Sequence, residues 1–360
     1  MARTIALVGG GTMGPTAPLL ALHAFWSRQR PRDKFIWIGT QEGPERKPVE
    51  ARGIPFYTIP SAKIPRYLTT KLITWPFDYL KARRAAGNLL DEHRPDIVIG
   101  AGGFTQVPVI RAAARRYIPC VVHQLDFQPG WSNLAVQKYC KVITTSFVYH
   151  NKKFRNCKEE KQIATPNRFV GSNPPETKLA KQHFGFDTKA PVILVIGGGT
   201  GSRALNQAVE TNIGKWLEKT QVLHITGRNR SENPPEQLGY KRFEFLDRDE
   251  LLQAYSAADI VISRAGMGGI TDLATLSKPT ILVPIKNSHQ EKNTRHLPIA
   301  TIEVKESENL FEDLYKNVLR LLKDPSKRKK LAHELHCTVP TDNGREWTSI
   351  IESYLPEDLE

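Results

Sequence analysis

Val192-Ile-Leu-Val-Ile-Gly-Gly-Gly-Thr-Gly201 is followed by a stretch with helical periodicity. The first five residues have the β-branched, apolar composition of a buried strand, and the glycines are typical of a tight turn. The same pattern occurs earlier, where Thr4-Ile-Ala-Leu-Val8 precedes Gly9-Gly-Gly-Thr-Met-Gly14 and a helical stretch. Each copy predicts a strand, a glycine loop and a helix, which is how a Rossmann-like unit begins.

Each copy is followed by further strand patterns that alternate with helical ones. The strands are expected at 34–39, 96–100, 120–123, 141–145, 222–225, 259–263 and 280–284. Such alternation indicates parallel sheets covered on both faces. Residues 151–178 contain few apolar residues and three prolines, and they predict a linker.

We therefore predict an α/β chain with two Rossmann-like, doubly wound parallel-sheet domains that face a cleft. The expected domains are residues 1–165 and 166–340, and a helical tail at 341–360 is expected to pack back on the first domain.

The charge of the chain is distributed unevenly. Its 360 residues include 51 Lys and Arg against 37 Asp and Glu, a formal net charge of +14. Residues 1–165 hold 25 basic and 11 acidic side chains, whereas residues 166–360 hold 26 of each. The first half should therefore meet an anionic partner: nucleic acid, phospholipid headgroups or a phosphorylated substrate. Apolar residues make up 40 %, which excludes a disordered or collagen-like chain.

Several classes of protein are disfavoured by what the sequence lacks. The sequence has no run of about 18 uninterrupted apolar residues, so no membrane-spanning helix is predicted. The first residues reach glycine too early for the apolar core of a signal peptide. The four cysteines are widely spaced and match no metal motif; they are Cys120, Cys140, Cys157 and Cys337. We expect reduced thiols in a cytoplasmic protein.

The most specific motif is Ser263-Arg-Ala-Gly-Met-Gly-Gly-Ile-Thr-Asp272. A strand there ends at a glycine turn, and the free N–H groups at the start of the next helix suit a diphosphate. A carboxylate one turn later can accept hydrogen bonds from both hydroxyls of a ribose. The alternative is that Asp272 merely favours the helix dipole.

Other polar segments allow a functional and a structural interpretation. His289 and Gln290 follow a strand, at the edge where open α/β sheets bind ligands, although a plain surface loop is the alternative. Asp247-Arg-Asp249 resembles an acid-x-acid metal motif, but Asp249 directly precedes a helical run, so we predict an N-cap there. Neither glycine loop has a full dinucleotide fingerprint or a P-loop lysine, which disfavours a nicotinamide oxidoreductase.

The segment 66–84 combines aromatic, aliphatic and basic side chains. The residues that suit a contact with anionic lipid are Leu72, Ile73, Trp75 and Phe77, with Lys71, Arg83 and Arg84. A helix that packs on the core, preceded by a loop, is the alternative. Pro76 predicts a break, so we do not expect one straight amphipathic helix.

Taken in order, several motifs resemble the MurG family, the GT-B glycosyltransferases that build lipid II for peptidoglycan. They are the early loop with Gly10, Gly11, Thr12, Gly14 and Pro18, the PDIVIGAGGF segment with Pro108, the VVHQLD segment with Gly130 and Asn133, GGGTGSRALN at 197–206, His224 with Gly227, the 263–272 motif and HQEKN at 289–293. Their order and spacing cover nearly the whole chain.

The resemblance implies a GT-B fold and transfer of N-acetylglucosamine from UDP-GlcNAc to undecaprenyl-diphosphate-MurNAc-pentapeptide. The anomeric centre would be inverted, with no metal and no other cofactor. The enzyme would be peripheral on the cytoplasmic face of the inner membrane, with an anionic membrane surface and cell-wall synthesis proteins as partners. Nucleic acid is then not an expected partner.

By the same resemblance, the C-terminal half holds the nucleotide sugar. The implied contacts are Gly199, Thr200 and Gly201 near the phosphates, Leu246 at uracil, backbone N–H groups of Met267, Gly268 and Gly269, His289 and Gln290 at sugar hydroxyls, and Arg168 as the match of a linker arginine. Asp272 stands where the family has a ribose-binding glutamate, one methylene longer.

The N-terminal half would bind the lipid acceptor, with Thr12, Met13, Gly14 and Asn133 around its diphosphate. Two departures from the family concern catalysis. Pro15 replaces the histidine of the glycine loop, and the family's His-Glu-Gln-Asn is His123-Gln-Leu-Asp126 here. An inverting displacement needs a base near the acceptor hydroxyl. We predict Asp126 as that base and His123 as an orienting or accessory group; the alternative for Asp126 is a plain turn residue.

Two other functions remain open at this point. One keeps the fold but changes the acceptor to diacylglycerol or another polyprenyl lipid. The other is a non-catalytic, membrane-docked subunit that kept UDP-sugar binding after the loss of the histidine.

Overall fold

The computed structural model describes residues 2–11, 13–61, 71–147, 149, 153–199, 201–227 and 237–355, with only the backbone at 71 and 72. The chain divides into two compact units. The first comprises Met1–Arg168 and Thr341–Glu360, and the second comprises Phe169–Pro340. Each is built on a parallel sheet, so the predicted α/β class is confirmed.

The sheet of the first unit has the strand order β3-β2-β1-β4-β5-β6-β7. The strands are β1 (Thr4–Val8), β2 (Lys34–Gly39), β3 (Phe56–Thr58), β4 (Ile97–Gly100), β5 (Cys120–Gln124), β6 (Val142–Thr145) and β7 (Glu159–Gln162). The pairings between neighbours are parallel, so the carboxyl ends of the strands lie along one edge. The order reverses beside β1, and open α/β sheets bind ligands at such a point.

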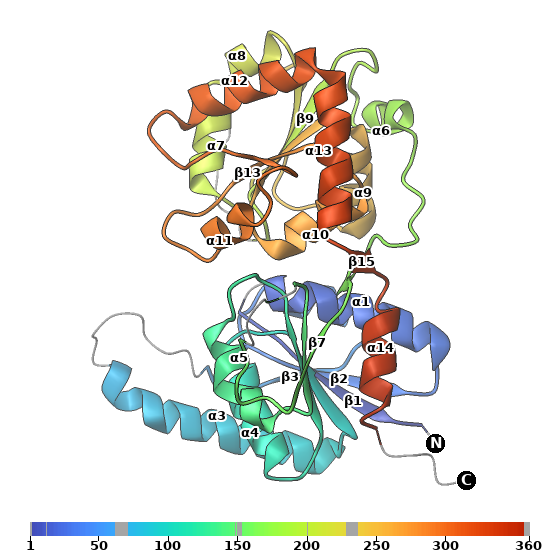
Figure 1. Ribbon diagram of the computed structural model, residues 1–360, viewed down its shortest axis with the longest axis vertical. Coiled ribbons are helices and arrows are strands. Elements are labelled where there is room, and N and C mark those ends of the chain that lie inside the picture. Colours follow the sequence, from blue (N-terminus) through green and yellow to red (C-terminus); the bar gives the residue numbers. More distant parts are fainter. Residues whose placement is uncertain are drawn as a thin grey trace. The chain divides into compact units, whose positions relative to one another are not determined.

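Helices cover both faces of this sheet (Figure 1). They are α1 (Met13–Gln29), α2 (Arg46–Glu50), α3 (Lys71–His93), α4 (Gln106–Ala114), α5 (Trp131–Val136), the 3₁₀ turn η1 (Gln137–Tyr139) and α14 (Arg345–Glu352). Alternate residues of β1 point to opposite faces: Ala6 and Val8 join the core under α3 and α4, whereas Ile5 and Leu7 pack with α1 and α14.

The predicted linker contains regular structure. Strand β7 and the short β8 (Thr165–Pro166) both fall within residues 151–178. The expectation was wrong there because β7 is an edge strand with the polar sequence Glu-Glu-Lys-Gln, which carries no apolar alternation. Strand β8 pairs with β15 (Thr341–Asp342), and Arg168 is the last residue of the first stretch of that unit.

The sheet of the second unit has the order β11-β10-β9-β12-β13-β14. Its strands are β9 (Val192–Ile196), β10 (Gln221–Ile225), β11 (Tyr240–Phe243), β12 (Ile260–Arg264), β13 (Thr280–Val283) and β14 (Ile302–Glu303). Its helices are α6 (Thr177–His183), α7 (Arg203–Glu210), α8 (Ile213–Leu217), α9 (Arg248–Ala257), α10 (Met267–Thr275), α11 (Gln290–Arg295), α12 (Leu310–Lys323) and α13 (Pro325–Thr338).

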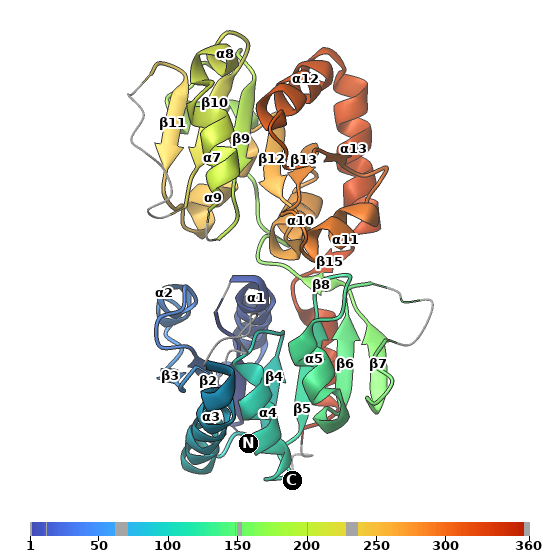
Figure 2. The same cartoon turned by 90° about the vertical axis from the view of Figure 1, so that its left-hand side faces the viewer.

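The core of this second sheet includes side chains from α7, α8 and α12, and Figure 2 shows α7 lying along β9 and β10. Trp216 of α8 is fully buried and contacts Phe311 of α12 edge-on. Within the unit, α10 and α11 lie at one end, and α8 and α12 lie at the opposite end (Figure 1). The glycine-rich turns and α10 are thus at the carboxyl edge of the strands.

Two local predictions were wrong. The N-cap of α9 is Asp247 rather than Asp249, because the Asp247 carboxylate accepts the N–H groups of Asp249 and Glu250, each at 3.0 Å. Helix α3 runs through Pro76 without ending. Pro76 falls in the second turn, where the missing N–H costs one hydrogen bond at an exposed position.

Candidate functional site

The glycine loop after β9 adopts a conformation that side chains disfavour. Gly198 and Gly201 have φ values of +81° and +72°. A Cβ atom on Gly201 would lie 2.2 Å from the carbonyl oxygen of Thr226, in the loop after β10. Gly201 is therefore required for these two loops to pack together. Gly199 is exposed beside them, and Thr200 lies outside the described residues.

Arg264, the last residue of β12, connects three strand ends. Its Nε donates to the Ser202 hydroxyl at 3.0 Å, and Ser202 is the N-cap of α7. Its Nη1 donates to the Val283 carbonyl oxygen at 3.2 Å and pairs with the Glu306 carboxylate at 2.6 Å. The guanidinium is largely buried, so this planar fork fixes the loops after β9, β12 and β13 relative to one another.

Helix α10 begins directly after the Gly266 turn and presents its first N–H groups at this edge. The N–H of Gly269 already donates to the Gly266 carbonyl oxygen at 3.0 Å. Of the three predicted N–H donors of α10, Met267 and Gly268 are therefore the better candidates for binding a ligand. A Cβ on Gly268 would meet nothing within 4 Å, which leaves the backbone there open to a ligand.

The segment after β13 packs against the same turn. The Gln290 side chain accepts the N–H of Ile285 at 3.1 Å, and its Nε2 lies 3.6 Å from the position of a Cβ on Gly266. Asn293 donates to the Ala265 carbonyl oxygen at 3.0 Å. The structure thus brings Gln290 to the start of α10, and it exposes His289 at the N-cap of α11.

The remaining donor candidates differ in exposure. Asp272 is buried, with 4 % of its surface exposed, in the second turn of α10. Leu246 is also buried and directly precedes the Asp247 cap. Arg168 lies within the first unit. His224 is fully buried between Tyr240 and Asn206, at 3.0 and 3.1 Å, and burial lowers its pKa to about 3, so it is a neutral structural residue.

The glycine loop after β1 is packed as closely as the loop after β9. A Cβ on Gly103, in the loop after β4, would lie 2.8 Å from the Gly10 carbonyl oxygen. Pro15, in the first turn of α1, lies against this contact, with Cγ 3.5 Å from the same position. Met13 and Gly14 are partly exposed beside it, and Thr12 lies outside the described residues.

A network of buried amides joins the loops after β4 and β5. Gln106 accepts the N–H of Gly102 at 2.8 Å and donates to Asn133. Asn133 in turn donates to Gln124 at 2.7 Å, and Gln124 accepts the N–H of Gly130 at 3.1 Å. Both polar atoms of the Asn133 side chain are hydrogen-bonded, so Asn133 links the loops after β4 and β5. Neither Gln106 nor Gln124 was predicted as a site residue from the sequence, because their partners Asn133 and Gly130 follow a different strand or a later turn.

The two candidates for proton transfer have different environments. His123 is fully buried, with its ring nitrogens 3.0 Å from the Thr144 hydroxyl and 3.1 Å from the Ser146 hydroxyl. Burial lowers the pKa of His123 to about 3, which favours an orienting role over proton transfer. Asp126 is partly exposed in the loop after β5, and its backbone carbonyl accepts from the Gln124 amide at 2.7 Å.

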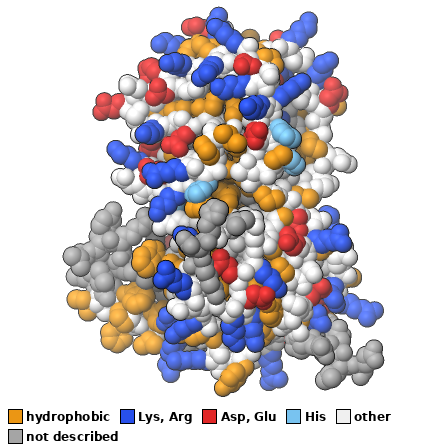
Figure 3. All heavy atoms as spheres, viewed as in Figure 1, with side chains coloured by type: hydrophobic (Ala, Val, Ile, Leu, Met, Phe, Trp, Pro, Cys, Tyr) orange, Lys and Arg blue, Asp and Glu red, His pale blue; other side chains and the backbone are white. Residues whose placement is uncertain are grey.

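Helix α3 exposes a stripe of hydrophobic side chains. Ile73, Phe77 and Leu80 are 75 %, 66 % and 49 % exposed, and their spacing puts them on one face of the helix. Figure 3 shows hydrophobic side chains gathered over α3, with Lys and Arg beside them. Trp75 stacks on Tyr79, and Arg83 lies over the Tyr79 ring. Among the described residues, no helix is long and apolar enough to span a bilayer.

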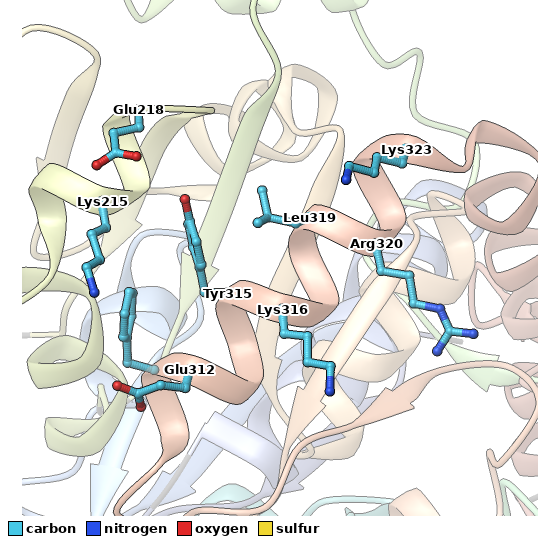
Figure 4. A pocket seen from close by; sticks show the side chains of 9 residues that line it. Lys215, Glu218, Glu312, Tyr315, Lys316, Leu319, Arg320 and Lys323 are labelled. Carbon is cyan, nitrogen blue, oxygen red and sulfur yellow. The ribbon is translucent and has the colours of Figure 1, made fainter.

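A cavity of about 660 Å³ lies elsewhere in the second unit, along α8 and α12 (Figure 4). Its lining includes Lys215, Phe311, Tyr315 and Arg320, and none of the predicted donor residues. Within the described part of the chain, no three His, Cys, Asp or Glu side chains are grouped as a metal site requires.

Comparison with known proteins decides the family. Residues 5–145 match the N-terminal domain of glycosyltransferase family 28, and residues 192–341 match the C-terminal domain of that family. A protein of Clostridium botulinum is 36 % identical over 289 residues, 79 % of each chain. The chain is a MurG-type member of glycosyltransferase family 28. The resemblance inferred from the motifs is thereby confirmed.

The names of similar proteins and the solved structures agree with this assignment. The Clostridium botulinum protein is named UDP-N-acetylglucosamine--N-acetylmuramyl-(pentapeptide) pyrophosphoryl-undecaprenol N-acetylglucosamine transferase, and so is a Nocardioides protein that is 36 % identical over 302 residues, 81 % of each chain. The crystal structure of Acinetobacter baumannii MurG matches with a TM-score of 0.72 at 21 % identity, over 98 % of this chain and 100 % of that one. The calicheamicin glycosyltransferase CalG4 matches with a TM-score of 0.66 at 15 % identity, over 100 % of both chains. These structures confirm the GT-B fold.

The Arg264–Glu306 pair should couple strongly in this family 28 fold. Because Arg264→Met leaves Glu306 and the bonded carbonyls without their partner, we expect it to lower the free energy of unfolding by about 2–4 kcal/mol. A double-mutant cycle with Glu306→Gln, measured by urea denaturation, should give a coupling energy of about 1–3 kcal/mol. Arg248→Met, at a more exposed guanidinium, is the control. A coupling energy near zero would show that Arg264 and Glu306 do not stabilise the fold as a pair.

Proposed function

We propose that this protein transfers N-acetylglucosamine from UDP-GlcNAc to undecaprenyl-diphosphate-MurNAc-pentapeptide, the step from lipid I to lipid II in peptidoglycan synthesis. The observation that carries the proposal is the 36 % identity, over 79 % of both chains, to relatives named for that transfer. The geometry supports it, because each sheet carries a closely packed glycine loop at its carboxyl edge.

The donor is assigned to the second unit. The N–H groups of Met267 and Gly268 and the loop at Gly199 and Gly201 form an edge that suits the diphosphate of UDP. Asp272 is assigned to the ribose, Leu246 to the uracil, and Gln290 with His289 to the sugar hydroxyls. Gln290 supports this assignment most directly, because its side chain lies at the turn that starts α10.

Transfer by inversion is a single displacement. The acceptor hydroxyl oxygen bonds to the anomeric carbon as the bond from that carbon to the UDP phosphate oxygen breaks. The hydroxyl proton passes to the Asp126 carboxylate, and the negative charge passes to the departing UDP. Asp126 suits the role of base because it is partly exposed, whereas His123 is buried and neutral. Thr12, Met13 and Gly14 are assigned to the acceptor diphosphate.

Stabilisation of the leaving UDP is assigned to the start of α10. Backbone N–H groups at a helix N-terminus favour negative charge without proton transfer. We therefore propose transfer without a metal ion, and activity should persist in EDTA.

The acceptor is a lipid, so the enzyme must reach the membrane surface. The exposed Ile73 and Phe77 on α3, flanked by Arg83 and Arg84, suit a peripheral contact with anionic lipid. The excess of basic side chains before residue 166 favours the same surface. We propose a cytoplasmic enzyme docked on the inner membrane through this stripe, where cell-wall synthesis proteins would be its neighbours.

Donor binding is testable by calorimetry. UDP-GlcNAc should bind the wild type, and Asp272→Asn should weaken UDP binding about tenfold or more, since it loses charge-assisted hydrogen bonds to the ribose. Asp313→Asn removes an exposed carboxylate of the same unit and should bind as the wild type does. Absence of binding by the wild type would overturn the donor assignment.

The base assignment is tested by turnover with a short-chain lipid I analogue. Asp126→Asn should lower kcat about 10²–10⁴-fold, because the amide cannot take the proton, while calorimetric affinity for UDP-GlcNAc stays unchanged. Unchanged turnover would show that Asp126 is not the base. If the wild type binds UDP-GlcNAc but does not transfer the sugar, the protein is a non-catalytic UDP-sugar-binding subunit. That is the alternative suggested by Pro15 in place of the family histidine.

Membrane docking is tested by sedimentation with phosphatidylglycerol liposomes. The double substitution Ile73→Ser with Phe77→Ser should weaken binding at least about tenfold, because both side chains lose their burial in the lipid interface. Leu179→Ser, at a 58 % exposed leucine of α6, is the matched control. Binding that ignores the double substitution, salt and lipid charge would exclude this surface.

A further inference from the structure

A buried carboxylate lies beneath the glycine loop of the first unit. Glu45 is fully buried, although it directly precedes the short, exposed helix α2. Its Oε2 accepts the backbone N–H of Gly11 at 3.2 Å. Its Oε1 accepts the backbone N–H of Thr40 at 2.9 Å and also the Thr40 hydroxyl. One carboxylate thus joins the loop after β1 to the loop after β2.

The surrounding residues leave room for this carboxylate and little else. A Cβ on Gly43 would lie 1.9 Å from Oε2 of Glu45, and a Cβ on Gly10 would lie 2.6 Å from Oε1. The hydroxyl of Thr105, at the N-cap of α4, points toward the same Gly10 position at 3.0 Å. Within the described residues, that buried hydroxyl has no hydrogen-bond partner. Three loops at the carboxyl edge of the sheet therefore converge on Gly10 and Gly11.

The choice of a carboxylate follows from the groups that it meets. Gly11 and Thr40 both offer N–H donors, on opposite oxygens of the same side chain. A carboxylate has two acceptor oxygens and can satisfy both, whereas an amide has one acceptor oxygen and one donor nitrogen. Burying a charged group is costly unless such hydrogen bonds are made. Glu45 is consequently matched to a fixed conformation of the glycine loop.

We infer that Glu45 is a positioning residue for the acceptor diphosphate: by accepting the N–H of Gly11, it fixes the loop that leads to Met13 and Gly14, which are partly exposed. This inference rests on the proposed function, which assigns the diphosphate to that loop. Glu45 does not touch the diphosphate, since it is fully buried. Its loss should therefore affect acceptor binding and leave the donor unit unchanged.

Glu45→Gln is the sharpest variant, because it keeps the volume of the side chain. The amide oxygen of the glutamine can still accept the hydrogen bonds from Thr40. Its amide nitrogen then faces the N–H of Gly11, and two donors cannot form a hydrogen bond. We expect the KM for a short-chain lipid I analogue to rise about tenfold, with little change in kcat and none in calorimetric affinity for UDP-GlcNAc. Hydrogen exchange without substrate should become faster in a peptide that covers residues 9–14.

Two variants serve as controls. Glu42→Gln removes the same charge from an exposed position in the same loop and should leave both readouts unchanged. Thr40→Val removes the hydroxyl contact with Glu45 but keeps the Gly11 bond, so its KM should also stay near that of the wild type.

The outcomes separate this inference from the proposed function. A KM in Glu45→Gln that equals or falls below the wild-type value would overturn the inference and leave the proposed function standing. So would a uniform fall of kcat, donor affinity and thermal stability, which indicates a merely structural role. If the wild type transfers sugar to no lipid diphosphate, the proposed function fails, and hydrogen exchange at residues 9–14 still decides whether Glu45 holds the loop.

Discussion

Within each sheet, loops from neighbouring strands pack backbone against backbone at the carboxyl edge. Each candidate site depends on this close packing. At Gly201 a side chain would strike the Thr226 carbonyl oxygen, and at Gly103 it would strike that of Gly10. Glycine permits these approaches and the positive φ values that accompany them. Because parallel strands end at the same edge, loops from neighbouring strands must pack there anyway. Glycine lets these loops pack closely and leaves peptide N–H groups exposed at the surface, where they can bind phosphate.

Buried polar side chains then hold these loops in place. In the second unit, Arg264 joins three strand ends and is balanced by Glu306. In the first unit, the amides of Gln106, Asn133 and Gln124 serve the loops after β4 and β5, and Glu45 serves those after β1 and β2. Each of these groups is hydrogen-bonded, as burial requires. A preorganised backbone loses little entropy when a diphosphate binds, which is the advantage of fixing it in advance.

Strands such as β1 and β9 were predictable because apolar, β-branched runs that end at glycine leave a strong local signal. The family followed from the order of its motifs. Strand β7 was missed because a polar edge strand carries no such signal. Asp249 was mistaken for the cap that Asp247 provides because the two carboxylates are two residues apart, and Asp249 lies in the first turn of the same helix. Glu45, Gln106 and Arg264 could not be found from local pattern, since each bonds at least one residue of a distant loop that only the sheet order brings near. The composition of residues 66–84 predicted a contact with anionic lipid, which stays a prediction, and the continuity of α3 through Pro76 was not predicted.

We propose that the two glycine-lined edges serve one glycosyl transfer, with UDP-GlcNAc as donor and a MurNAc-bearing lipid diphosphate as acceptor. The most direct measurement is a matrix of radiolabelled UDP-sugars against lipid acceptors in the presence of EDTA, with label followed into the lipid fraction. Label from UDP-GlcNAc should enter the MurNAc-pentapeptide diphospholipid, in greater amount than label from UDP-glucose or UDP-galactose, and should not enter diacylglycerol. Preferential labelling of diacylglycerol, or no labelling of any lipid by a protein that binds UDP-GlcNAc, would contradict this proposal.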